Sequence, residues 1–71
     1  REIDFTAWLD GMPEFYQVAW SINDPMVLDM EVRSLTKVEG KRVLITMDLD
    51  IPEVPDGIEV VRAPEFFLER D

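Results

Sequence analysis

The 71-residue sequence contains no cysteine and no histidine. Without cysteine, a disulfide framework, a zinc finger and a thiol nucleophile are all excluded. Without histidine, there is no imidazole for general acid–base catalysis and no histidine–metal site. The absence of cysteine is compatible with a reducing compartment, and we expect a cytoplasmic protein.

Basic residues are scarce as well. Seven Lys and Arg face 16 Asp and Glu, which gives a formal net charge of -9 and a pI near 4.2. Such a surface repels phosphate backbones, so we expect no nucleic-acid partner. No apolar run approaches the roughly 20 residues of a membrane span, and no signal peptide is visible, so no membrane partner is expected. The three glycines are isolated, which leaves no glycine-rich phosphate loop and no cofactor expected for this chain.

The apolar content of 46% and charged content of 32% are typical of a globular domain. At this length we predict a single domain, residues 1–71, with a thin core. The sequence opens on Arg1, inside what reads as a strand. We therefore expect an excised C-terminal fragment of a longer chain.

A hairpin is predicted at the N-terminal end. Residues 2–9 alternate, which places on one face Ile3, Phe5, Ala7 and Leu9, and on the other Glu2, Asp4, Thr6 and Trp8. Asp10-Gly11 is a strong turn signal, and residues 14–20 read as the second strand. A two-residue turn makes paired positions sum to 21, so that the opposing pairs are Ile3 with Val18, Asp4 with Gln17, and Phe5 with Tyr16. A four-residue loop would shift this register by two and keep the same faces.

The remaining elements follow from caps, turns and apolar runs. Asp24 and Pro25 predict the start of a helix that runs to about Val38 and is ended by residues 39–41. Residues 42–47 are almost continuously apolar, typical of a strand covered on both faces. A loop over 48–57 and a strand over 58–62 follow, and Pro64 starts a last helical turn that packs Phe66 and Phe67. The predicted order is β-β-α-β-β-α, an α/β fold with a mixed sheet and a right-handed crossover helix.

Polar positions on the predicted hairpin are the main candidate site. An acidic residue on one strand beside an acid-x-lysine pair on the next makes a compact metal site for phosphodiester cleavage. Here the positions read Glu2 and Asp4 on one strand, then Gln17 and Ala19 on the other. An amide and a methyl group supply neither charge nor a strong ligand. We therefore interpret this set as a vestigial site, with Asp4 and Gln17 in a polar cross-strand contact.

Two alternatives stay open for chemistry. Glu2 and Asp4 could hold magnesium in a nuclease whose cation, Arg33 or Lys37, reaches in from the helix. An acidic loop with Asp48, Asp50, Glu53 and Asp56 follows the buried strand, at an edge of the sheet that often carries ligand sites, and could attract a calcium or magnesium ion. A solvated acidic loop is the preferred interpretation there.

The tryptophans are candidate interface residues. Trp8 and Trp20 fall on opposite faces of the predicted hairpin, so both faces are expected to be covered, by this domain or by another part of a longer chain. A tryptophan left exposed would indicate binding to a protein partner or self-association.

Short segments along the chain carry a family resemblance. They are residues 2–5 (EIDF), 16–21 (YQVAWS), 33–35 (RSL), 43–48 (VLITMD) and 56–60 (DGIEV). Together they resemble the uncharacterised C-terminal domain that follows the P-loop ATPase module and winged-helix region in a family of prokaryotic AAA-type ATPases. That domain is similar to the restriction-endonuclease-like fold.

The resemblance implies a degenerate nuclease-like domain. Asp4 would occupy the strand aspartate position, Gln17 the glutamate position and Ala19 the lysine position, so two of three depart from the catalytic pattern. The ATP site would lie in an upstream module of the same chain, the implied partner. We therefore expect a non-catalytic accessory or interaction domain. The alternatives are a magnesium nuclease and an independent small protein-binding module.

Overall fold

The computed structural model describes residues 3–63. Four strands and one helix follow in the order β1 (Phe5–Leu9), β2 (Met12–Ala19), α1 (Pro25–Thr36), β3 (Lys41–Thr46) and β4 (Ile58–Arg62). They form a small α+β domain with a mixed sheet in the order β1-β2-β3-β4. The last helical turn predicted from Pro64 lies outside the described residues, as does Glu2. Within those residues, no helix is long and apolar enough to cross a membrane.

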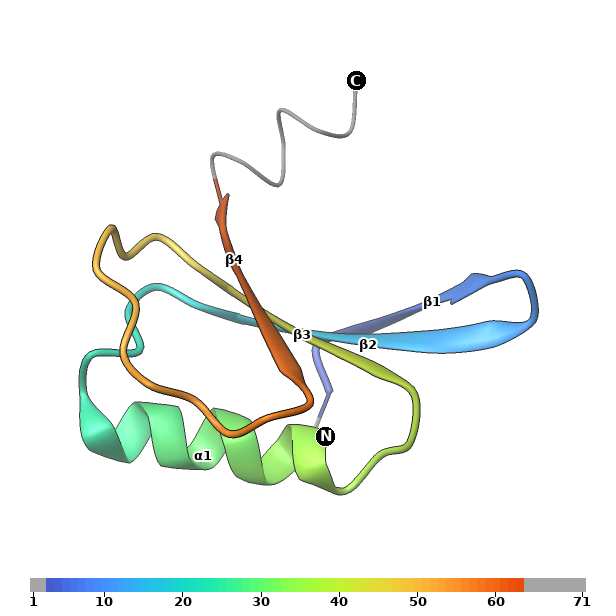
Figure 1. The fold of residues 1–71 in the computed structure, drawn as a ribbon, viewed down its shortest axis with the longest axis horizontal. Coiled ribbons are helices and arrows are strands. Elements are labelled where there is room, and N and C mark those ends of the chain that lie inside the picture. Colours follow the sequence, from blue (N-terminus) through green and yellow to red (C-terminus); the bar gives the residue numbers. More distant parts are fainter. Residues whose placement is uncertain (1–2, 64–71) are drawn as a thin grey trace.

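The sheet combines a hairpin with a parallel crossover. β1 and β2 are antiparallel, whereas β2, β3 and β4 run parallel. Helix α1 makes the connection from β2 to β3 and lies against one face of the sheet (Figure 1). No helix covers the opposite face among the residues described, and we call this side the open face. The predicted crossover role of the helix is confirmed.

The hairpin register is confirmed, but its N-terminal boundary is not. Phe5 pairs with Tyr16 as predicted, through a turn in which Asp10 and Gly11 both have positive φ, 53° and 78°. β1 begins at Phe5 rather than at residue 2, because the chain bends at Asp4. The prediction that Ile3 and Phe5 share a face is wrong for the same reason. Ile3 packs on the helix side, while Phe5 stacks on Tyr16 on the open face.

Helix α1 begins where predicted and ends earlier. The Asp24 side chain accepts a hydrogen bond from the backbone N–H of Met26 at 2.9 Å, and Pro25 opens the helix. The helix stops at Thr36 with Lys37 as its C-cap, two residues before the end predicted near Val38. Its last carbonyls are taken by short-range bonds, including one from the N–H of Val38 to Leu35, which tighten the final turn.

Apolar side chains fill both faces of β3. Beneath α1 the buried residues are Ala19, Ile22, Leu35, Leu44 and Ile58. On the open face, a smaller cluster contains Val43, Ile45 and Ala63, with Tyr16 and Val61 packed against it. β3 is therefore covered on both sides, as its continuous apolar run predicts. The other buried residues come from β2, β4, α1 and the segments next to them.

Candidate functional site

Asp4 continues the hydrogen bonding along the edge of β2 at the point where β1 stops pairing with it. Its backbone N–H donates to Gln17 Oε1 at 2.6 Å, and its carboxylate Oδ2 accepts from the backbone N–H of Val18 at 2.8 Å. The side chain thus offers β2 the acceptor that another residue of β1 would have supplied. The predicted contact between Asp4 and Gln17 exists. It runs from the backbone N–H of Asp4 to the side chain of Gln17.

Gln17 continues the contact to the helix. Its side chain is 5% exposed, and Nε2 donates to Glu31 Oε1 at 2.9 Å. The amide therefore accepts from one segment and donates to another, and both of its ends are satisfied. We call this arrangement the Asp4–Gln17–Glu31 bridge. It connects the residue before β1, strand β2 and the middle of α1.

Burial of Glu31 raises the pKa of its carboxyl group, and the nearby negative charge of Asp4 raises it further. The hydrogen bond from Gln17 opposes both effects. Desolvation and a like charge both disfavour the ionised form. The bridge therefore places the Glu31 carboxyl group, which accepts from the Gln17 amide, near the negative charge of Asp4.

Ala19 stands at the predicted lysine position, and Arg33 and Lys37 are the cations considered as replacements for that lysine. Ala19 faces the same side of β2 as Gln17, is 8% exposed and belongs to the core beneath α1. Arg33 forms an ion pair with Asp29 one turn away, and its side chain is 70% exposed. Lys37 is an exposed residue at the helix C-cap.

Sequence reasoning missed Glu31. The signal was present, because position 31 lies one turn from Leu28 and Leu35 and so falls within the apolar stripe of the helix. A carboxylate in that stripe requires a polar partner, and Gln17 is the buried polar residue opposite it. Over residues 3–63, no group of three or more acidic side chains lies close enough to hold a metal ion.

The acidic loop after β3 is tied down at its first residue. Asp48 Oδ2 accepts from the backbone N–H of Ile22 at 2.7 Å and contacts Thr46 Oγ1 at 3.2 Å. The bond from Ile22 holds the pKa of the Asp48 carboxyl group below its usual range, against a smaller opposing effect of burial. Asp48 thus joins the end of β3 to the segment that leads into α1.

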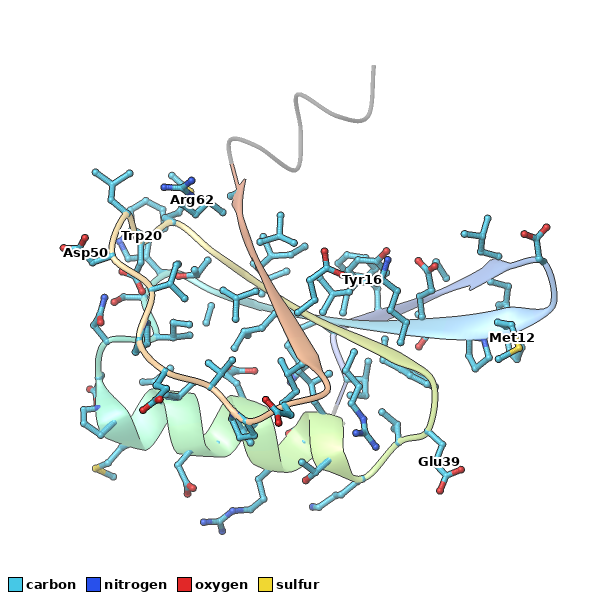
Figure 2. All side chains as sticks on the ribbon, in the orientation of Figure 1. Met12, Tyr16, Trp20, Glu39, Asp50 and Arg62 are labelled. Carbon is cyan, nitrogen blue, oxygen red and sulfur yellow. The ribbon has the colours of Figure 1, made fainter. Side chains whose placement is uncertain are left out.

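An apolar pocket opens beside the same ends of the strands. It encloses about 220 Å³ and is lined by Val18, Ala19, Trp20, Ile45, Thr46, Met47 and Ala63. Trp20 is 79% exposed and Val18 51% exposed. In Figure 2, Trp20 lies at the end of the molecule that also carries Asp50 and Arg62, away from Met12 at the tip of the hairpin. Trp8, also well exposed, pairs with Pro13 near that tip.

Comparison with protein-family models, curated proteins and solved structures finds no match to this chain. The resemblance to the ATPase C-terminal domain, and the nuclease-like arrangement that it implies, therefore stay predictions. They are carried by the residues quoted for them. The geometry of the bridge and of the pocket is independent of that resemblance.

Proposed function

We propose that this chain is a non-catalytic protein-interaction domain, the C-terminal accessory module of a cytoplasmic prokaryotic AAA-type ATPase. The observation that carries the proposal is the state of Gln17, whose amide is buried and bonded at both ends. A side chain in this state braces three segments, and both ends of its amide are engaged within the fold.

The chemistry of the surrounding groups supports the same function. Magnesium prefers hard oxygen ligands at octahedral geometry, and phosphodiester cleavage uses a nearby cation as well. At the two positions of β2, the chain offers an occupied amide and a buried methyl group. The carboxylate of Asp4 is directed to the backbone N–H of Val18. These contacts favour a structural role for the polar residues.

Exposed apolar groups support the interaction part of the proposal. Trp20, Val18 and Met47 all line the pocket and are 79%, 51% and 42% exposed. Tryptophan is enriched among residues that dominate binding energy in interfaces. The resemblance stated above makes an upstream ATPase module of the same chain one candidate partner.

A cleavage assay tests the non-catalytic part. The chain is incubated with supercoiled plasmid and single-stranded DNA in the presence of Mg²⁺ or Mn²⁺, beside an Asp4→Ala variant. We expect no difference between the two proteins and no cleavage above the metal-only control. Metal-dependent cleavage by the natural sequence that disappears in Asp4→Ala would overturn the proposal.

A further inference from the structure

We infer that the pocket beside Trp20 binds a basic peptide segment of a partner protein, one that inserts a single large apolar side chain. This inference rests on the proposed interaction function and names the chemistry of the partner. Two features carry it. One is the apolar pocket, and the other is the charge of the loop that borders it.

The pocket supplies the anchor site. Four of its seven lining residues are large and apolar, namely Val18, Trp20, Ile45 and Met47, and the others are Ala19, Thr46 and Ala63. Its volume of about 220 Å³ is enough for one large side chain and too small for a folded element. An apolar side chain entering it would remove the exposed flank of Trp20 from water, which is the main source of affinity at such sites.

The adjoining loop supplies the charge. Residues 47–57 contain four acids, Asp48, Asp50, Glu53 and Asp56, and no basic residue. The loop starts at the pocket, since Met47 lines the pocket and Asp48 contacts Thr46 in its wall. It then leads away along α1, where Pro55 lies beside Pro25 and Leu28, and reaches Ile58 at the opposite end of β3. Asp48 and Asp50 are therefore the loop acids nearest the pocket, and Glu53 and Asp56 lie further along the loop. Figure 2 places Asp50 at the same end of the molecule as Trp20, where Arg62 is the nearby basic residue that the view labels. A segment with several Lys or Arg residues complements this border.

Charge also selects among the occupants. A second copy of the chain would bring another formal charge of -9 to the same edge, and a nucleic acid would bring phosphates. Both would meet like charge, which costs free energy and slows encounter. A basic protein segment would meet opposite charge, which lowers the free energy of the complex and speeds encounter. The apolar pocket and the acidic border therefore point to one occupant.

Nuclear magnetic resonance of the full chain gives a direct test, because the two tryptophans provide a matched pair. The probes are acetyl-KKLFKK-amide and acetyl-KKIWKK-amide, added to ¹⁵N-labelled protein. The controls are acetyl-KKSGKK-amide, which lacks the anchor, and acetyl-EELFEE-amide, which reverses the charge. The two indole N–H signals are assigned with Trp20→Ala and Trp8→Ala.

We expect a saturable shift of the Trp20 indole signal with the basic anchored peptides and none at Trp8. Binding should be roughly tenfold weaker for either control peptide and for Trp20→Ala, and unchanged in Trp8→Ala. It should weaken several-fold as ionic strength rises from about 0.01 M to about 0.1 M, where the screening length falls from about 30 Å to about 10 Å.

Other outcomes overturn the inference and are distinguishable from failure of the proposed function. Equal binding of the acidic peptide would show that the pocket does not select a basic partner, while the proposed interaction function would still stand. No shift at Trp20 with either basic anchored peptide would also overturn the inference. A Trp20 signal that moves with protein concentration alone would identify a second copy as the occupant. One that moves on Phe67→Ala alone would identify the C-terminal segment of the same chain. Failure of the proposed function is measured separately, because it would appear as metal-dependent DNA cleavage in the plasmid assay.

Discussion

At the scale of single residues, the contacts of Gln17 explain why an amide is suited to position 17. It accepts from the backbone N–H of Asp4 and donates to Glu31. A carboxylate can accept both ways but cannot donate when ionised. A glutamate at position 17 would therefore place a third negative group between two others. The residue that departs from the predicted nuclease-like pattern is thus the one that lets this bridge form.

Gln17→Glu tests that interpretation. The variant should lower the free energy of unfolding by about 2 kcal/mol at pH 7, because a buried donor is lost and a charge is added beside Asp4 and Glu31. Part of the loss should return near pH 4, where carboxyl groups protonate. Urea unfolding at both pH values measures it. A variant as stable as the natural protein at pH 7 would contradict the bridge.

Glu31→Gln should stabilise the protein at neutral pH. The pKa of Glu31 is raised by folding, so the folded state holds its proton more tightly than the unfolded state does. Stability from this group is therefore greatest below its unfolded pKa, near 4.5, and is lost as pH rises through the folded pKa. Glutamine imitates the protonated form, and its advantage should shrink as pH falls towards 4.5. Thermal unfolding against pH checks this, with the exposed Glu39→Gln as control. A gain that grows on acidification would have the wrong sign.

Gly40 is needed for close packing as well as for its backbone conformation. Its φ is +147°, and a Cβ there would lie 2.6 Å from the carbonyl oxygen of Pro13. The residue was predicted to end the helix, but it lies beyond the C-cap Lys37 and leads into β3. Gly40→Ala should cost about 2–3 kcal/mol of unfolding free energy. Gly11→Ala, with positive φ but nothing within 4 Å, should cost about 1 kcal/mol. Equal losses of unfolding free energy in the two variants would show that the close contact with Pro13 does not destabilise Gly40→Ala.

At the scale of elements, β1 and β3 differ most in how they are held. All five residues of β1 are exposed, whereas Val43 to Thr46 of β3 are buried. β1 is retained by its ladder with β2, by the stacking of Phe5 on Tyr16 with ring centroids 4.7 Å apart, and by Asp4 at its start. Local stability should therefore fall from the centre of the sheet towards β1.

Hydrogen exchange measures this gradient. Amides of β1 should exchange faster than those of β3, and Asp4→Ala should selectively accelerate Val18, whose N–H loses its acceptor. Leu44 in β3 serves as the internal reference, because it is fully buried. If Asp4→Ala left Val18 protected, or accelerated Leu44 equally, the edge role of Asp4 would be wrong.

At the scale of the whole molecule, short local signals predicted most of the described fold. Asp10-Gly11 set the hairpin register, Asp24-Pro25 started the helix, and the apolar run before Asp48 indicated a strand covered on both faces. The start of β1 could not be predicted in the same way. There, a side chain of Asp4 replaces strand hydrogen bonds, which the alternation of apolar residues does not encode.

The candidate site was predictable only in part. Strand periodicity correctly predicted that Asp4 lies close to Gln17 and that Ala19 shares a face with Gln17. The third member of the bridge comes from a helix 14 residues away in sequence from Gln17, and only packing determines that approach. The pocket beside Trp20 likewise depends on Ala63 from beyond β4, so the exposed tryptophan could be suspected but its surroundings could not.

The central claim is that the Asp4–Gln17–Glu31 bridge is structural and not a metal site. The most direct measurement is a Mg²⁺ titration observed at the side-chain amide protons of Gln17 by ¹H–¹⁵N correlation spectra. Raising Mg²⁺ to about 10 mM, above the about 1 mM dissociation constants of weak protein cation sites, should produce no saturable shift at Gln17. A saturable shift there that is abolished by Asp4→Ala would contradict the account.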